Sequence, residues 1–224
     1  MGHPRLAVII PAFCEAATIA DVVRAARRHA DVIVIDDCST DDTGSVARDA
    51  GAVVVRNAAN LGYDATLSAG FDAAADREYT HAITMDADGE HDPALVPQFA
   101  AALIDRGMPL VLGVRPAKQR VAETIMGFAI RMRFGADDIL CGMKGYDMAL
   151  WQLNGGFDHY GSIGTELAIN ALKARVPFEQ IAVGGTRRVD QPRFDRRWRA
   201  NARIMQGLGG MLVRRENPLA EALA

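Results

Sequence analysis

Three acidic side chains, Asp86, Asp88 and Glu90, alternate along a short segment that follows an apolar run. In an extended segment, alternate side chains point the same way, so these three face one direction. Oxygen ligands at this density are typical of Mg²⁺ or Mn²⁺ sites, in which water and phosphate fill the remaining positions. We therefore predict that the three side chains ligate a divalent cation. The alternative is a solvated acidic turn in which Asp92 caps a helix that begins at Pro93.

A second acidic group follows the apolar run that ends at Ile35. It contains four aspartates in seven residues, Asp36, Asp37, Asp41 and Asp42. Asp41 and Asp42 are expected to cap the next helix. Ligands of open α/β sheets bind beyond the carboxyl ends of the strands. Asp36 and Asp37 are therefore expected to accept hydrogen bonds from the base or ribose of a nucleotide.

Several classes of protein are excluded by motifs that the chain lacks. Pro-Ala-Phe-Cys-Glu (11–15) follows the first apolar run where a dinucleotide-binding protein has G-x-G-x-x-G. The chain also has no G-x-x-x-x-G-K-[ST] motif, which excludes a P-loop protein. Its three cysteines, Cys14, Cys38 and Cys141, are too few and too scattered for a disulfide framework, which indicates a reducing compartment.

The elements that position these residues alternate between buried strands and amphipathic helices over the first 115 residues. Such a pattern predicts a mainly parallel sheet with helices on both faces. The predicted strands are Arg5–Ile10, Asp31–Ile35, Ala52–Val55, His81–Met85 and Leu110–Gly113. The predicted helices are Thr18–His29, Thr43–Ala50, Tyr63–Ala75 and Pro93–Arg106.

The remainder of the chain is less regular. Helices are expected at Val121–Phe134, Gly164–Arg175 and, with a basic face, Phe194–Leu208. A loop with a short strand is expected at Asp137–Tyr146, and a strand at Phe178–Val183. No internal repeat or linker interrupts the pattern, so we predict a single α/β domain over residues 1–224, with halves at 1–115 and 116–224.

Charge is distributed unevenly along a chain whose residues are half apolar. Residues 1–110 carry 8 basic and 17 acidic side chains, whereas residues 111–224 carry 17 basic and 11 acidic ones. An acidic half favours bound cations, and a basic half favours phosphate or an anionic surface. We expect neither a transmembrane helix nor a signal peptide, and a cytoplasmic protein that could lie against the cytoplasmic face of a membrane.

Four segments in order carry a more specific resemblance: VIIPAFCEAATI (8–19), VIVIDDCSTDDT (32–43), NLGYDATLSAGFDAA (60–74) and ITMDADGEHDP (83–93). Together they resemble the family 2 glycosyltransferases of GT-A fold. The similarity is greatest to the branch of dolichyl-phosphate mannose synthases and related polyprenyl-phosphate glycosyltransferases. It continues more loosely to about residue 203.

The resemblance implies roles for residues of the first half. Asp86 and Asp88 form the D-x-D motif that holds Mg²⁺ or Mn²⁺ on the donor pyrophosphate, and Asp37 contacts the base. The other residues expected near the nucleotide are Pro11, Ala12, Glu15, Gly62 and Tyr63. Two positions depart from the family: Cys14 stands where asparagine is usual, and Glu90 replaces a glutamine.

The same resemblance implies roles for residues of the second half. Arg115 matches a phosphate-contacting arginine, and Asp138 and Lys144 belong to a segment similar to the family's D-x-x-x-G-F-R near the acceptor. Glu166 matches an acidic position at the start of a helix. A basic loop that closes over phosphates in the family would contain Arg187, Arg188 and Arg193. The alternatives are surface or capping roles for Asp138 and Glu166 and an ordinary solvated loop for the three arginines.

The expected activity is inverting, metal-dependent transfer of a hexosyl group from a nucleoside diphosphate sugar to a polyprenyl phosphate. The alternative is transfer to a soluble sugar or another hydroxyl acceptor, which would need Asp138 or Glu166 as a base. A sugar nucleotidyltransferase and an inactive nucleotide-sugar binding module are less favoured. Nucleic acid is not an expected partner, because the acidic half would repel it. A homodimer and a peripheral membrane contact are left open.

Overall fold

The computed structural model describes residues 3–116, 121–159, 162–184 and 217–223, with side chains of 121–126 excepted. Its centre is a seven-stranded sheet of order β3-β2-β1-β4-β6-β5-β7. Every strand pair that includes β6 is antiparallel, and all the others are parallel. The strands are β1 (Leu6–Ala12), β2 (Asp31–Asp36), β3 (Val53–Arg56), β4 (His81–Thr84), β5 (Leu110–Val114), β6 (Lys144–Asp147) and β7 (Phe178–Ala182).

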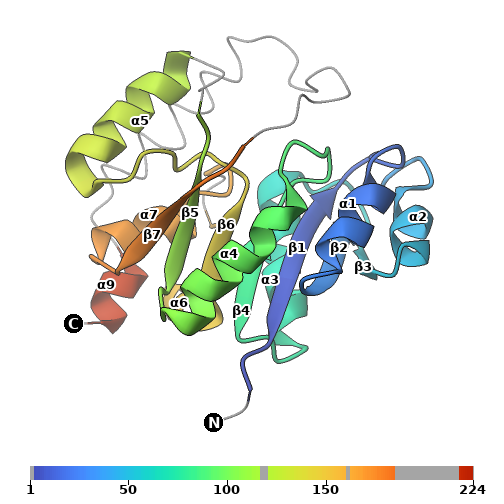
Figure 1. Cartoon of the computed structure of the whole chain (residues 1–224), viewed down its shortest axis with the longest axis horizontal. Coiled ribbons are helices and arrows are strands. Elements are labelled where there is room, and N and C mark those ends of the chain that lie inside the picture. Colours follow the sequence, from blue (N-terminus) through green and yellow to red (C-terminus); the bar gives the residue numbers. More distant parts are fainter. Residues whose placement is uncertain (1–2, 117–120, 160–161, 185–216, 224) are drawn as a thin grey trace.

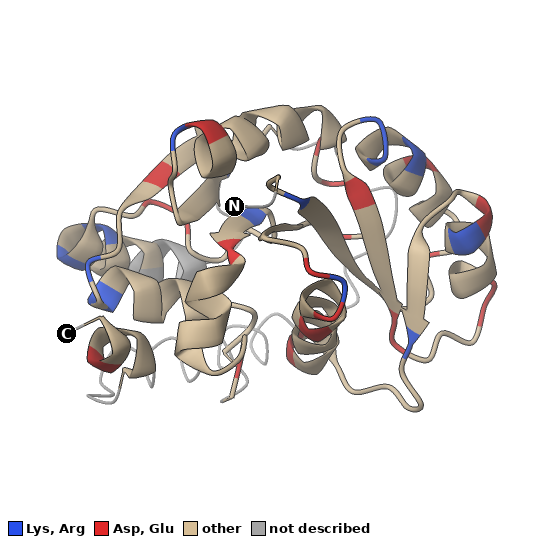
Figure 2. Cartoon of the chain, turned by 90° about the horizontal axis from the view of Figure 1, so that it is seen from below, with Lys and Arg blue, Asp and Glu red and all other residues tan. Residues whose placement is uncertain are grey.

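Helices cover both faces of this sheet, and Figure 2 shows the two helical layers on either side of it. One layer contributes to the core around Val8 and Ile10 and contains α1 (Ile19–Ala26), α2 (Thr43–Asp49) and α4 (Val96–Ala100). The other layer contains α3 (Tyr63–Ala75), α6 (Met148–Asn154), α7 (Glu166–Lys173) and α9 (Pro218–Ala222). α5 (Val121–Phe134) lies at the end of the sheet next to β5 and β7 (Figure 1).

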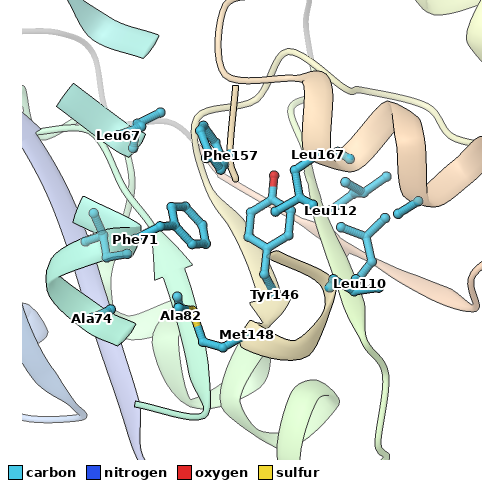
Figure 3. Packing of buried hydrophobic residues seen from close by; sticks show 14 of the residues in the cluster. Leu67, Phe71, Ala74, Ala82, Leu110, Leu112, Tyr146, Met148, Phe157 and Leu167 are labelled. Carbon is cyan, nitrogen blue, oxygen red and sulfur yellow. The ribbon is translucent and has the colours of Figure 1, made fainter. Parts of the chain in front are cut away.

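An aromatic cluster joins the two halves of the chain on the face of the sheet that α3 covers (Figure 3). The ring of Phe71 on α3 stacks on Phe157 with centroids 4.5 Å apart. Tyr146 on β6 meets Phe71 edge-on at 5.5 Å. All three side chains are fully buried, and aromatic contacts of this kind stabilise a core beyond the area they bury. The cluster therefore fixes α3 against β6 and against the segment that leads into α7.

The predicted α/β architecture with a mainly parallel sheet is confirmed. The predicted helix Pro93–Arg106 is instead divided into a 3₁₀ turn (Pro93–Leu95), α4 and a π turn (Ala101–Asp105). In the π turn, the amide of Arg106 bonds to the carbonyl of Ala101, one residue beyond the α-helical partner. Asp92 caps the 3₁₀ turn, since its side chain accepts a hydrogen bond from Ala94 N.

Two short helices were not predicted, and one predicted helix cannot be compared. α6 begins after Asp147, whose side chain accepts from Ala149 N, and ends at Gly155 in the left-handed region. α9 begins after Asn217, whose side chain accepts from Ala220 N. Both are too short for a helical periodicity to stand out in the sequence. The predicted helix Phe194–Leu208 lies outside the described residues. Within the described part of the chain, no helix has the length and apolar character that a membrane span requires.

Candidate functional site

The acidic segment Asp86–Glu90 follows β4 at the edge where the parallel strands end. Asp86 Oδ1 accepts a hydrogen bond from the Tyr63 hydroxyl at 3.1 Å. Asp88 Oδ1 accepts from the backbone N of Glu90 at 3.0 Å, which tightens the turn. The three carboxylates remain partly exposed. The structure thus presents the predicted metal ligands on one loop at the sheet edge.

His91 lies buried beneath this loop, in a position that the sequence did not reveal. Its Nδ1 is 3.3 Å from the backbone N of Asp86 and 3.6 Å from Oδ2 of the same residue. Its Nε2 is 3.8 Å from Sγ of Cys141. Burial lowers the pKa of His91, but Cys141, Asp86 and Asp88 outweigh it and raise the pKa to about 9. His91 therefore links the first aspartate of the loop to the strand connection that contains Cys141.

A divalent cation fits the residues of this loop. Gly142 packs directly against the carboxylate of Asp86, because a Cβ at position 142 would overlap that carboxylate. Among the described residues, no group of three or more acidic, histidine or cysteine side chains is arranged to hold a metal by itself, so Asp86, Asp88 and Glu90 do not converge as the predicted three-carboxylate site. Asp86 and Asp88 offer the hard oxygen ligands that Mg²⁺ and Mn²⁺ prefer, and substrate phosphates and water commonly supply the other ligands of such ions.

The two aspartates at the end of β2 are both engaged with the protein itself. Asp36 is fully buried, pairs with Arg56 and accepts from Ser39 N at 2.8 Å. Asp37 accepts from Asn57 Nδ2 at 2.8 Å. Asp37 also accepts from the backbone N of residues 61 and 62, at 2.8 and 2.9 Å. Asp36 therefore anchors β3, and Asp37 shapes the turn that leads into α3.

The other predicted nucleotide-side residues surround the ends of β1 and α3. Pro11 and Ala12 are buried at the end of β1, and Ala12 O accepts from Asp37 N at 2.8 Å. Glu15 N donates to Thr43 Oγ1 at 2.7 Å. Gly62 precedes α3, and Tyr63 is its first residue. These contacts bring the predicted nucleotide residues to the same edge as Asp86.

Arg115, directly after β5, forms a two-pronged ion pair with Asp138. Arg115 Nε is 2.7 Å from Asp138 Oδ2, and Nη2 is 3.0 Å from Oδ1. The Asp138 side chain is 3% exposed and that of Arg115 is 18% exposed. Burial would raise the pKa of Asp138, but the guanidinium outweighs it and lowers the pKa. Asp138 is thus a weakly basic carboxylate that holds Arg115 in one orientation.

Lys144, the first residue of β6, is buried at the same edge. Its Nζ donates to the carbonyl oxygen of Gly164 at 3.2 Å. Burial lowers the pKa of Lys144, while the nearby charges of Asp86 and Asp138 act in the opposite direction. Lys144 is therefore within electrostatic range of a carboxylate from each half of the chain.

Glu166, the first residue of α7, is 1% exposed and pairs with a histidine that sequence reasoning did not single out. Its two oxygens lie 2.6 Å from the backbone N and from Nδ1 of His159. The hydrogen bond to Glu166 raises the pKa of His159, against the effect of burial. His159 and Glu166 are separated by a loop, in which no periodicity relates side chains seven positions apart, so the sequence carries no signal for this pair. Arg187, Arg188 and Arg193 lie outside the described residues.

Comparison with known proteins gives both a family match and individual relatives. Residues 7–140 match the family model described as "Glycosyl transferase family 2". The "Undecaprenyl-phosphate mannosyltransferase" of Micrococcus luteus is 33% identical over 119 residues, 50% of this chain and 48% of that protein. The "Glycosyltransferase AglJ" of Haloferax volcanii is 31% identical over 186 residues, 74% of this chain and 58% of that protein. The chain thus spans about half to three fifths of the length of these relatives.

Solved structures share the fold over almost the whole chain. Glucosyl-3-phosphoglycerate synthase from Mycobacterium tuberculosis, in complex with Mn²⁺, UDP and phosphoglyceric acid, matches with a TM-score of 0.77. The two sequences are 19% identical, and the match covers 96% of this chain and 80% of that one. At this identity, the similarity extends to the fold alone.

Proposed function

Because the chain belongs to glycosyltransferase family 2, we propose that it transfers a hexosyl group from a nucleoside diphosphate sugar to a polyprenyl phosphate, with inversion at the anomeric carbon. The observation that carries the choice of a phosphate acceptor is the pair of cations Arg115 and Lys144 at the edge that also presents Asp86. Asp138 holds Arg115 through both carboxylate oxygens, so the guanidinium is fixed before an anion arrives.

In the proposed reaction, a phosphate oxygen of the acceptor forms a bond to the anomeric carbon. The bond from this carbon to the diphosphate breaks, and its electron pair leaves with the diphosphate. A divalent cation held by Asp86 and Asp88 would supply Lewis-acid stabilisation of the leaving diphosphate. A phosphate acceptor is ionised near neutral pH and needs no base, so Arg115 and Lys144 would serve to bind and orient it.

The relatives and α5 support a lipid as the carrier of this phosphate. Two curated relatives are named for undecaprenyl-phosphate and polyprenol acceptors. On α5, Phe128 is 66% exposed and Met132, one turn later, is 71% exposed. Arg131 and Arg133 are also exposed and lie among these apolar side chains. A helix face with this composition suits an anionic membrane surface.

A hydroxyl acceptor is the second candidate, and the pair of Glu166 and His159 favours it. A hydroxyl nucleophile must lose its proton during the transfer, which requires a base. Glu166 is a buried carboxylate at the start of α7, and its hydrogen bond to His159 would stabilise charge on the pair. The phosphoglyceric acid of the structural neighbour is an example of a soluble acceptor, bound by that protein.

The experiment that separates the two candidates measures sugar transfer from labelled nucleotide sugars, with Mn²⁺ or Mg²⁺, to both kinds of acceptor. The acceptors are a polyprenyl phosphate in detergent and a soluble phosphorylated hydroxy acid. For a phosphate acceptor, Glu166→Gln should change the rate little. The double variant Arg187→Ala, Arg188→Ala, which removes two cations of the basic loop implied by the family resemblance, should reduce the rate strongly. For a hydroxyl acceptor the ranking reverses, since loss of a base costs about 10²- to 10⁴-fold in rate. Transfer to the soluble acceptor alone contradicts the lipid proposal.

A further inference from the structure

Asp64, in the first turn of α3, is a half-buried carboxylate that the roles described so far do not use. Its Oδ1 accepts a hydrogen bond from the backbone N of Gly164, which lies 100 residues later in the sequence. Burial and the charge of Asp158 raise the pKa of Asp64. A half-buried carboxylate needs hydrogen-bond donors, and the backbone N of Gly164 is one of them.

Gly164 is held from three sides. Its backbone N donates to Asp64, and its carbonyl oxygen accepts from Lys144 Nζ at 3.2 Å. Its φ of +62° lies in the left-handed region. A Cβ at this position would lie 3.0 Å from Tyr63 Cε1 and 3.1 Å from Leu67 Cδ1, so α3 packs directly on the glycine. Conformation and space therefore both require glycine here.

The turn around Gly164 leads directly into α7, whose first residue is Glu166. Thr165 is the residue before α7, and Glu166 is its first residue. The hydroxyl of Thr165 donates to Ser162 O at 2.5 Å, and Ser162 N donates to Asp158 at 3.0 Å. The position of Gly164 therefore determines where Glu166 begins its helix.

The same turn of α3 also reaches the acidic loop of the donor half. Tyr63, the neighbour of Asp64, donates its hydroxyl to Asp86 Oδ1 at 3.1 Å. Two consecutive side chains thus connect one helix end to Asp86 on one side and to Gly164 on the other. Lys144 contributes to the connection, because it binds Gly164 and lies near Asp86.

We propose that Asp64 is a positioning residue, which through Gly164 sets Glu166 and α7 in register with Asp86. The inference rests on the proposed function for its assignment of Asp86 to the donor side and Glu166 to the acceptor side. In this role Asp64 acts through the backbone N of Gly164. Its effect on transfer is indirect and passes through the backbone of residues 162–166.

The first test is amide hydrogen exchange on the full chain without ligand. Asp64→Ala removes the acceptor for Gly164 N and should speed exchange of residues 162–168 by about tenfold, as expected for one hydrogen bond to a charged group. Asp64→Asn keeps a carbonyl oxygen and should restore most of the protection. Asp72→Ala, an exposed aspartate on the same helix, is the matched control and should leave the segment unchanged. Unchanged exchange in Asp64→Ala, or an equal increase in Asp72→Ala, overturns the proposal.

The second test is kinetic, on the same three variants. Asp64→Ala should lower kcat about tenfold or more, because a shifted Gly164 displaces Lys144, which binds its carbonyl oxygen and would orient the acceptor phosphate. The KM for the nucleotide sugar should stay within about twofold, because the donor side is intact. Asp64→Asn should recover most of kcat, which a general loss of folded protein would not explain. A kcat unchanged in Asp64→Ala contradicts the positioning role. If the unaltered enzyme transfers sugar to no acceptor, the proposed function fails, whereas the exchange experiment still decides the role of Asp64.

Discussion

Arg115 and Asp138 form a buried ion pair in which the guanidinium meets both carboxylate oxygens, at 2.7 and 3.0 Å. Asp138 also accepts a hydrogen bond from the backbone N of Arg115 at 3.2 Å, so the carboxylate fixes both the side chain and the end of β5. The pair connects the sheet edge to the segment before β6. The geometry of the pair shows that Asp138 positions Arg115, and the lowered pKa of Asp138 makes this carboxylate a weak base.

Asp138→Ala is expected to destabilise the protein by about 3–5 kcal/mol, because it removes the carboxylate of a largely buried ion pair with Arg115. Urea unfolding measures this loss. The matched control is Glu179→Ala, which breaks the exposed two-pronged pair with Arg106 and should cost far less. Equal losses in the two variants would show that burial of the Arg115 pair does not matter.

Asp88→Ala is expected to keep the fold and to reduce transfer by about 100-fold or more, because the proposed cation loses a ligand and the leaving diphosphate loses its stabilisation. Removal of divalent cations with EDTA should have the same effect on the unaltered enzyme. Asp92→Ala is the control, since Asp92 only caps the 3₁₀ turn, and its loss should cost about 1 kcal/mol of stability without loss of transfer. Near-normal turnover by Asp88→Ala argues against the metal assignment.

Asp37→Ala is expected to weaken nucleotide binding by about 10- to 100-fold, measured by calorimetry with a nucleoside diphosphate and Mn²⁺. Part of this loss would come from the turn at residues 61 and 62, whose amides donate to Asp37. Asp42→Ala is the control, because Asp42 precedes the first residue of α2 and its side chain makes no capping hydrogen bond. An affinity that does not change in Asp37→Ala removes Asp37 from the nucleotide site.

The pair of His159 and Glu166 should make stability depend on pH. The pKa of His159 is raised above its ordinary 6.5 in the folded protein by its hydrogen bond to Glu166. A raised folded-state pKa stabilises the fold fully below the unfolded value, and this contribution is lost as the pH rises through the folded value. The stability difference between the unaltered protein and His159→Gln should therefore shrink as the pH rises above about 6.5, the ordinary value of histidine. A constant difference in urea unfolding would indicate that the histidine is not charged.

The exposed face of α5 should bind anionic membranes if the acceptor is a lipid. Phe128→Ser with Met132→Ser should reduce cosedimentation with vesicles that contain anionic lipid, because the apolar side chains no longer enter the interface. Leu153→Ser, which alters a 40% exposed leucine on α6, is the control and should bind as the unaltered protein does. Transfer to a detergent-solubilised acceptor should persist in both variants. Equal vesicle binding by all three proteins excludes α5 as the contact.

The sequence by itself determined the features that depend on neighbouring residues. Continuous apolar runs predicted β1, β2 and β4, because buried parallel strands need apolar side chains on both faces. Helical spacing predicted α3 with its observed limits, Tyr63–Ala75. The order of strands and loops also indicated that Asp37 and Asp86 would reach the same sheet edge, since parallel strands end together.

Only the tertiary structure decided which side chains of the two halves meet. Asp138 pairs with Arg115 across 23 positions, and Asp64 binds Gly164 across 100. β6 enters between β4 and β5 in the opposite direction, which brings Lys144 beside Thr84 and Asp86. Local periodicity reports only on residues within a few positions of each other, whereas these pairs depend on how helices and strands pack across the sheet. The chemistry of the site depends on these pairs, because they determine which charged groups are held in place.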